Sequence, residues 1–371
     1  MPEADGPAAG LAYGRAPART AGGPPLYAAL DLGTNNCRLL IASPTHQGFR
    51  VVEAYSRIVR LGEGLSQSGR LSEAAMDRAL AALKICGDRV RRRPILRTQA
   101  VATQACRIAE NGGEFIRRVE RETGLRLRII APREEAQLSV AGCLGLLDHS
   151  TDAALVVDVG GGSTELSWVD LRDGRLNGSV HVPLEQLPIR AWVSVPVGVV
   201  TLAERYPESG HGDRAWFRSM VEEVKGRVAA YTLAEPFRRM FNAGRAHLIG
   251  TSGAITSLAG LHLGLQRYER TRVDGLWMTA SECTAAAERL LALPPAGRAA
   301  EPCIGPDRAD LVLAGAAILQ AVQELWPCER VRVADRGLRE GLLLSLMAEG
   351  RRTDPRRRRR RGSTAPQIVP A

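Results

Sequence analysis

The segment that decides the fold reads VVDVGGGSTEL at residues 156–166, and a shorter version of it, ALDLGTNN, stands at residues 29–36. Each begins as a buried-type strand, ends in Asp-x-Gly and continues into a turn of small and polar residues. The aspartates, Asp31 and Asp158, are 127 positions apart (158 − 31 = 127). The repeat predicts a duplicated domain, in which each half opens with a hairpin whose turn faces the other half across a cleft.

The composition is that of an ordinary globular chain. With 371 residues, 45% of them hydrophobic and 24% charged, it excludes collagen, a coiled coil and wholesale disorder, and its length favours two domains. No stretch approaches the ~18 apolar residues of a membrane span, and residues 1–25 lack the apolar core of a signal peptide. We therefore expect a cytoplasmic protein without a membrane partner. Seven widely spaced cysteines favour reduced, buried thiols.

The net charge of +10 is concentrated near the C-terminus. Residues 351–361 hold eight arginines and one aspartate, a contribution of +7, which leaves +3 for the other 360 residues. The body is nearly balanced, so a nucleic-acid partner is not favoured. The arginine segment either attracts a polyanion at a distance, with an affinity that falls as salt rises, or serves solubility alone.

Strand and helix signals alternate along the chain and divide it into four parts. Residues 1–25 are rich in Ala, Gly and Pro, and residues 348–371 in Arg, Pro, Gly and Ser/Thr, so we expect both to be disordered tails. Between them we predict an N-terminal lobe, residues 26–147, and a C-terminal lobe, residues 148–347. Both are of the α/β class.

Three turns rich in small residues are candidates for binding phosphate. Two follow the Asp-x-Gly strands, and the third stands between a strand and a helix start within residues 247–256. Backbone N–H groups without bulky side chains can approach an anion, and a helix N-terminus adds donors. The alternative is that the glycines only make tight turns. The candidates are Gly33, Thr34, Asn35, Gly160, Gly161, Gly162, Ser163, Gly250, Thr251, Ser252 and Gly253.

Carboxylates accompany the turn after the second strand. Asp158 ends that strand, and Glu165 lies three residues beyond Gly162, where the returning strand holds it over the same turn. Carboxylates beside bound phosphate suit Mg²⁺, which takes one or two of them together with phosphate oxygens and water. The alternative is a pair of acids in an exposed turn. Asp158 and Glu165 are the candidate metal ligands.

A base and a cation complete the set of candidates. Glu134 and Glu135 stand in the first turn of a helix predicted over residues 133–147, where they also complement the helix dipole. Neighbours on a helix diverge by ~100°, so at most one of them points into a cleft, and the sequence alone does not choose. Arg107 follows a predicted strand and can form a fork onto phosphate oxygens, or it can be one of many surface arginines.

Seven segments resemble the Ppx/GppA family of exopolyphosphatases and guanosine pentaphosphate phosphohydrolases. They lie within residues 27–347 and read AALDLGTNNCRLLIA, VATQACRIAENGGEFIRRV, EEAQLSVAGC, VVDVGGGSTELSWV, LIGTSGAITSLAGL, IGPDRADLVLAGAAIL and VADRGLREGLL. Asp-x-Gly turns are shared with Hsp70 and sugar kinases, whereas ATQACRIA, EEA and DVGGGSTEL in that order are specific to this family. The resemblance implies two duplicated ribonuclease-H-like domains of the actin/Hsp70 type around a cleft.

The resemblance also implies roles. Glu135 becomes the base that activates the attacking water, Arg107 binds phosphate, Asp158 and Glu165 serve Mg²⁺, and the three turns hold the phosphate chain. Two features depart from the family pattern. Residues 131–132 are Ala-Pro where family members often carry Ser-Gly, which can change the aim of Glu135. Long members also append a helical HD-type domain, where this chain has its arginine-rich segment.

We therefore expect a phosphoric anhydride hydrolase, an exopolyphosphatase that releases terminal phosphate from inorganic polyphosphate with Mg²⁺. The first rival is the same chemistry on guanosine pentaphosphate, because nothing in the sequence reads a guanine base. An ATP-dependent kinase or ATPase of the same superfold rests on the Asp31 and Asp158 turns alone. A non-catalytic polyanion-binding or RNA-binding module leaves Glu135 and the turns without a role. A homodimer is compatible with the sequence, which does not specify one.

Overall fold

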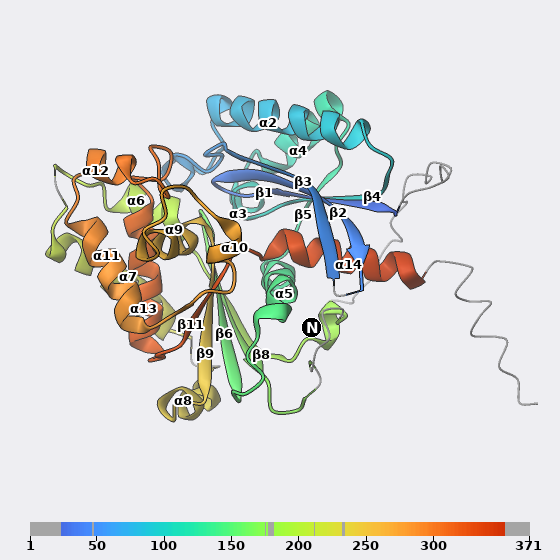
Figure 1. Ribbon diagram of the computed structural model, residues 1–371. Helices are drawn as coiled ribbons and strands as arrows, with labels where there is room; N and C mark the ends of the chain where they lie inside the picture. Colours follow the sequence, from blue (N-terminus) through green and yellow to red (C-terminus); the bar gives the residue numbers. More distant parts are fainter. Residues whose placement is uncertain are drawn as a thin grey trace, which may run out of the picture.

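The protein folds around two β-sheets with helices on their faces (Figure 1). The structure is a computed structural model, and it describes residues 24–46, 48–174, 176, 182–210, 212–231 and 234–352. The predicted tails lie largely outside these residues. The folded part nevertheless continues past the predicted end at residue 347, because the last helix reaches Arg352.

The first sheet has the strand order β3-β2-β1-β4-β5. Its strands are β1 (Leu26–Leu32), β2 (Asn36–Thr45), β3 (Gly48–Ile58), β4 (Ile95–Ala102) and β5 (Leu127–Ile129). β1 pairs antiparallel with β2 and parallel with β4. The strands predicted around the first Asp-x-Gly turn are thus present, and the turn joins β1 to β2.

The second sheet repeats this pattern in the order β10-β11-β9-β6-β7-β8. Its strands are β6 (Ala153–Val159), β7 (Thr164–Asp170), β8 (Ile189–Val195), β9 (Ala246–Thr251), β10 (Trp277–Met278) and β11 (Val331–Ala334). β6 pairs antiparallel with β7 and parallel with β9, as β1 does with β2 and β4. The duplication predicted from the two Asp-x-Gly segments is confirmed.

The helices begin and end at recognisable local signals. Ser72 accepts the N–H of Ala75 at the start of α2, and Gly124 ends α4 in the left-handed conformation. The helix predicted over residues 133–147 ends earlier, and a 3-10 turn follows at Leu144–Leu146. A second 3-10 turn stands at Leu184–Gln186. The helices are α1 (Leu65–Ser68), α2 (Glu73–Arg91), α3 (Gln104–Ile108), α4 (Gly112–Thr123), α5 (Pro132–Cys143), α6 (Val199–Arg205), α7 (Arg214–Ala229), α8 (Glu235–Asn242), α9 (Gly253–His262), α10 (Arg270–Val273), α11 (Ala280–Leu291), α12 (Pro295–Ala300), α13 (Val312–Leu325) and α14 (Leu338–Arg352). Among the described residues, none of these helices is long and apolar enough to cross a membrane.

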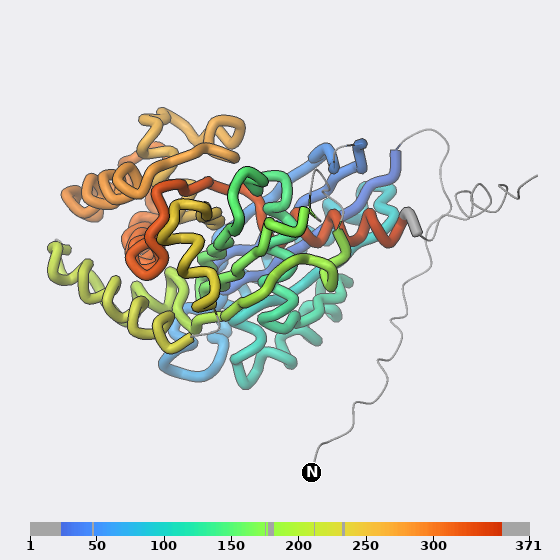
Figure 2. Tube along the Cα trace, turned by 90° about the horizontal axis from the view of Figure 1, so that it is seen from below, coloured from blue at the N-terminus to red at the C-terminus, as the bar shows by residue number. Residues whose placement is uncertain are grey.

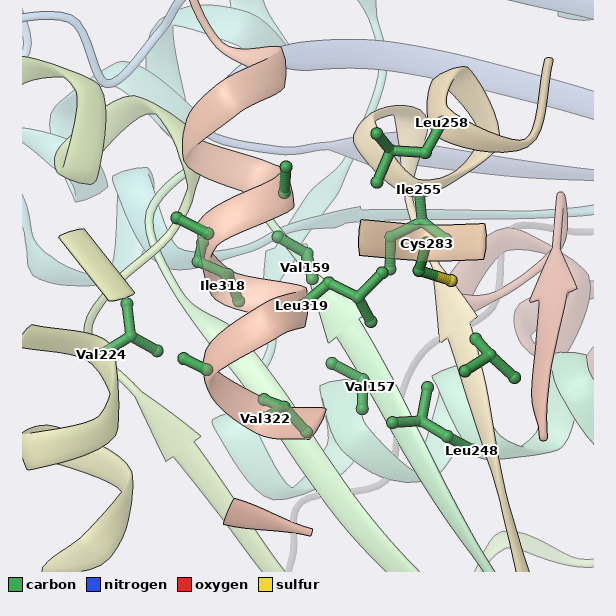
Figure 3. Close-up of a cluster of buried hydrophobic side chains, with 14 of the residues drawn as sticks. Val157, Val159, Val224, Leu248, Ile255, Leu258, Cys283, Ile318, Leu319 and Val322 are labelled. Carbon is green, nitrogen blue, oxygen red and sulfur yellow. The ribbon is translucent and has the colours of Figure 1, made fainter. Parts of the chain in front are cut away.

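Side chains that alternate along the central strand β6 pack into two different hydrophobic clusters, one on each face of the second sheet. Leu155, Val157 and Val159 of β6 belong to the cluster formed with helices α7, α9, α11 and α13. Figure 3 shows Val157 and Val159 pointing into this cluster. Ala154 and Val156 face the other way, toward α5. Because successive strand residues face opposite sides, Asp158 continues the row of Ala154 and Val156. Its carboxylate therefore lies on the face that looks toward the first sheet.

The first sheet is built in the same way. Ala28, Leu30 and Leu32 of β1 pack with α2 and α4, whereas Tyr27 and Ala29 pack with α14. Asp31 continues the second row and therefore lies on the face covered by α14. The alternation thus turns both aspartates of the repeat toward the space between the sheets.

Helices α5 and α14 occupy that space, side by side between the sheets (Figure 1). α14 also lies along β1 of the first sheet (Figure 2), and α5 packs on β6, β7 and β8. The two helices cross so closely that a Cβ on Gly341 would overlap the carbonyl oxygen of Leu138, and one on Gly142 would overlap that of Gly337. Residues of α14 belong to the predicted C-terminal lobe, yet the helix packs on the first sheet. The packing therefore does not divide the chain at residues 147 and 148, and that lobe boundary stays a prediction.

Candidate functional site

A cleft of about 450 Å³ lies where the edges of the two sheets meet α5, α9 and α14. Most of the residues singled out from the sequence line it. Arg107 and Gly250 do not, and the lining members are Gly33, Thr34, Asn35, Glu135, Asp158, Gly160, Gly161, Gly162, Ser163, Glu165, Thr251, Ser252 and Gly253. The fold therefore brings together residues that are far apart in the sequence.

The turns of the two repeats contact each other at this cleft, as the repeat predicts. A Cβ on Gly161 would lie 2.9 Å from that of Thr34, and one on Gly162 would lie 2.9 Å from the Thr34 Oγ1. Only glycine permits this approach. Buried Thr34 Oγ1 and Asn35 Oδ1 have no hydrogen-bond partner among the described residues. Because buried polar atoms normally have partners, these two are free to meet a ligand or water.

The third turn presents a helix N-terminus to the cleft. The backbone of Ser252 has φ 150°, a conformation that residues other than glycine rarely adopt. Its side chain accepts a hydrogen bond from the N–H of Ile255 at the start of α9. The N–H groups of the first turn of α9 and the positive end of its dipole favour an anion. Gly250 lies inside β9 behind this turn, where a Cβ would lie 2.8 Å from Ile255 Cδ1, so its small size serves packing.

The structure separates the two glutamates that the sequence left equivalent. Glu135 is 7% exposed and lines the cleft, whereas Glu134 forms two 2.6 Å bonds with the guanidinium of Arg128 outside it. The Ala-Pro start of α5 does not turn Glu135 away from the cleft.

Arg107 lies behind Glu135 and holds it. Its Nη1 donates to Glu135 Oε2 at 3.0 Å and to the carbonyl of Ile130 at 2.8 Å, and its Nη2 donates to Gln104 Oε1 at 2.5 Å. Arg107 is placed on α3 of the first sheet's half, and Glu135 on α5 between the sheets. The pair therefore joins the two halves at the candidate base.

Asp158 and Glu165 stand directly opposite each other on β6 and β7, so their side chains share one face of the sheet. The hydroxyl of Ser139 donates to Asp158 Oδ2, and that of Ser194 donates to Glu165 Oε1 at 2.7 Å. Two carboxylates lie side by side beside the glycine turn, as the sequence predicts.

Burial raises the pKa of four carboxyl groups that line the cleft. The pKa of Glu165 rises to about 7, through burial and the neighbouring Asp158, and that of Asp31 rises to about 6, through burial. Burial and Glu165 hold the pKa of Glu135 well above its usual range, against the opposing effect of Arg107. Burial also raises the pKa of Asp158. Such a cluster of acids favours binding of a cation.

The donor set fits Mg²⁺ in one limited way. Within the described part of the chain, no group of three or more His, Cys, Asp or Glu side chains is placed to hold a metal. Asp158 and Glu165 supply two carboxylates, and Mg²⁺ commonly takes no more than that from protein, with phosphate oxygens and water completing its octahedron. The residues present thus suit a cation whose other coordination positions are filled by water or by phosphate oxygens.

Three arginines of the cleft were missed by the sequence reasoning. Arg38, Arg308 and Arg339 line it, and within the described residues none of their guanidinium groups forms a hydrogen bond or an ion pair. The guanidinium atoms of Arg38 and Arg308 come within 3.8 Å of where a Cβ on Gly253 would lie. The available signal was the hairpin register, which sets Arg38 opposite Asp31. For Arg308 and Arg339 no comparable local signal exists.

These features can be compared with known proteins. The model of the Ppx/GppA phosphatase family matches residues 40–349, which include all the candidate site residues from Arg107 onward. The chain belongs to the Ppx/GppA phosphatase family. Its α/β architecture with two sheets is shared by a solved structure of this family.

Family relatives agree in sequence and in structure. The guanosine-5'-triphosphate,3'-diphosphate pyrophosphatase of Aeromonas hydrophila is 29% identical over 334 residues, which cover 90% of this chain and 62% of the relative. An exopolyphosphatase-like protein of known structure has a TM-score of 0.75 at 29% identity and covers 86% of this chain and 97% of its own. The family member from Aquifex aeolicus has a TM-score of 0.69 at 26% identity, over 88% and 98% of the two chains. The chain thus spans 62% of the length of the curated relative and nearly all of the solved structures.

Proposed function

We propose that this chain is an exopolyphosphatase, which removes the terminal phosphate of inorganic polyphosphate by attack of a water molecule that Glu135 activates. The observation that carries the proposal is the position of Glu135, buried in the cleft beside the three turns and held by Arg107. A carboxylate whose pKa is raised is a stronger base when ionised than a surface glutamate, because Brønsted behaviour ties basicity to pKa.

Cationic and N–H groups around the base suit a chain of phosphates. Arg38, Arg308 and Arg339, whose guanidinium groups have no partner among the described residues, offer positive charge along the cleft, and the backbone of the turns and of α9 offers donors. Donors fixed before reaction stabilise the charge that develops on the equatorial oxygens of a transferring phosphoryl group. Water is the acceptor in this proposal, and its proton passes to the carboxylate of Glu135.

Mg²⁺ is part of the proposal. Asp158 and Glu165 would hold it, and when bound it would supply positive charge to the phosphate oxygens. The carboxylates otherwise repel an anionic substrate, so neutralising them is needed for phosphate to bind next to them.

A second substrate has a specific observation in its favour. The Aeromonas hydrophila relative is named for hydrolysis of a guanosine triphosphate-diphosphate. Tyr268 also lines the cleft with 38% of its surface exposed, and an aromatic ring can stack on a nucleobase. Guanosine pentaphosphate is therefore the second candidate, with the same chemistry at its terminal phosphate.

Phosphate release from long-chain polyphosphate and from guanosine pentaphosphate, each with Mg²⁺ and with excess chelator, tests the proposal. We expect Mg²⁺-dependent release from polyphosphate, lost in Glu135→Gln. A higher kcat/KM for the nucleotide makes it the substrate instead. If neither compound is hydrolysed while ATP is, the proposal is wrong and an ATPase remains.

A further inference from the structure

The carboxylate pair is part of a longer polar row across the second sheet. Thr251, Asp158, Glu165 and Ser194 stand opposite one another on the neighbouring strands β9, β6, β7 and β8. Residues paired in this way share a face. The register therefore delivers the hydroxyl of Ser194 to Glu165, to whose Oε1 it donates at 2.7 Å. The chemistry proposed above gives this serine no role.

A second serine reaches the same row from a different element. Ser139 lies on α5, one turn after Glu135, and is 1% exposed between buried Leu138 and Val140. Serine inside a helix commonly bonds back to the carbonyl of residue i−4 and is less favourable there than alanine. Ser139 instead donates to Asp158 Oδ2. Ser139 thus gives α5 less stability than alanine would, and its hydroxyl bonds to the carboxylate of Asp158 on the neighbouring strand. We read the bond to Asp158 as the reason for a serine at this position.

The two hydroxyls leave part of each carboxylate available. Among the described residues, Asp158 Oδ1 accepts no hydrogen bond, because Ser139 uses Oδ2 alone. Glu165 accepts from the hydroxyl of Ser194 through Oε1. Side chains of adjacent like charges turn away from each other unless donors fix them. Each serine therefore limits the rotation of one acid.

We propose that Ser139 and Ser194 are positioning residues, which hold Asp158 and Glu165 in the orientation that binds a divalent cation. The proposal rests on the metal site of the proposed function. Donors of this kind, which touch a ligand and not the metal, commonly change metal affinity ~10 to 100-fold when removed. Ser139 also lies one helix turn after Glu135, so α5 carries both the base and the donor that holds Asp158.

Binding of Mn²⁺ as a stand-in for Mg²⁺, measured on the full chain without substrate by the electron paramagnetic resonance signal of the free ion, tests this proposal. We expect the Kd for Mn²⁺ to rise ~10 to 100-fold in Ser139→Ala and in Ser194→Ala. Ser194→Thr keeps the hydroxyl on a strand, where threonine is well tolerated, so it should keep the wild-type Kd. In assays with polyphosphate, the Mg²⁺ concentration for half-maximal activity should rise in the alanine variants.

Thr123→Val is the matched control, because the hydroxyl of Thr123 is buried and bonds to the carbonyl of Val119 in α4, far along the chain from the acids. It should lower thermal stability and leave the Kd for Mn²⁺ unchanged. Alanine variants that lose thermal stability yet bind Mn²⁺ like the wild type overturn the positioning role. A wild type that hydrolyses polyphosphate but binds no Mn²⁺ overturns it too and leaves the base in place. A wild type that hydrolyses nothing removes the proposed function itself.

Discussion

Replacing Arg107 with alanine should move the acid limb of the pH–rate profile toward higher pH. Arg107 Nη1 lies 3.0 Å from Glu135 Oε2, and the two side chains are only 17% and 10% exposed, so solvent screens the pair weakly. An opposite charge at this distance lowers the pKa of a carboxyl group by ~1 to 3 units. Without it, burial and Glu165 act on Glu135 unopposed, and the pKa of Glu135 rises further.

The size of the effect follows from the ionised fraction of the base. Below its pKa, a carboxyl group loses tenfold in ionised fraction for each pH unit, so a rise of ~1 to 3 units reduces kcat/KM ~10 to 10³-fold on the acid limb. Above the limb, Glu135 is ionised in both proteins. Any loss that remains there measures an effect of Arg107 on the substrate that does not pass through the ionisation of Glu135.

The assay is kcat/KM for polyphosphate between pH 5 and 9 at saturating Mg²⁺. Arg107→Lys keeps the charge and should keep the limb close to that of the wild type. Gln104→Ala removes an uncharged partner of Arg107 and should shift it little. The reasoning is refuted if Arg107→Ala lowers activity by the same factor at every pH, because the arginine then acts on the substrate and not on the base.

Three further outcomes are expected. Glu135→Gln should lower turnover in the phosphate-release assay ~10² to 10⁴-fold with KM little changed. The turnover of Glu134→Gln should stay within a few-fold of the wild type, because the Glu134 carboxylate pairs with Arg128 outside the cleft. Equal losses of turnover in the two variants contradict the assignment of the base. Glu165→Gln should raise the melting temperature at pH 8 without Mg²⁺ and should have no such effect below about pH 4.5. The pKa of Glu165 is raised to about 7 in the folded protein, so its ionised form lowers the stability of the fold by up to ~3 kcal/mol at pH 8. A variant that melts at a lower temperature than the wild type at pH 8 speaks against this cost. Gly341→Ala should lower the free energy of unfolding, measured in urea, by ~1 to 3 kcal/mol in spite of the high helix propensity of alanine, because its Cβ would overlap the Leu138 carbonyl oxygen. Gly226→Ala in α7, where a Cβ meets nothing within 4 Å, should raise that free energy by up to ~1 kcal/mol. Equal behaviour of the two variants refutes the close crossing of α5 and α14.

Local patterns predicted the parts of the site that depend on local structure. The hairpin turns at Gly33 and Gly160 follow from Asp-x-Gly after an apolar strand, and the register of β6 and β7 follows from the length of the turn between them. Asp158 and Glu165 could therefore be paired from sequence. The start of α9 at Gly253 was equally visible, since a strand, small residues and a helix pattern follow one another there.

The remaining features depend on tertiary structure. The choice between Glu134 and Glu135 is set by the rotation of α5 about its axis, which the crossing with α14 determines, and no local pattern records that crossing. Arg38, Arg308 and Arg339 differ from the other arginines in lining the cleft with no acidic partner among the described residues. That difference depends on which carboxylates come near in the folded chain. The bond between Arg107 and Glu135 likewise joins segments 28 positions apart (135 − 107 = 28).

The crossing of α5 and α14 lies close to the base. Glu135 is three residues from Leu138, or about 4.5 Å along the helix axis at 1.5 Å per residue. If the part built on the first sheet rotates about this point by ~10°, Glu135 and Arg107 separate by only about 1 Å, since the displacement grows with the lever arm. An open form in which α5 and α14 have slid apart would contradict this geometry. With such a rotation, the mouth of the cleft widens enough for a polymer chain to enter, while Glu135 stays within reach of Arg107. The base is then in position before the phosphate binds.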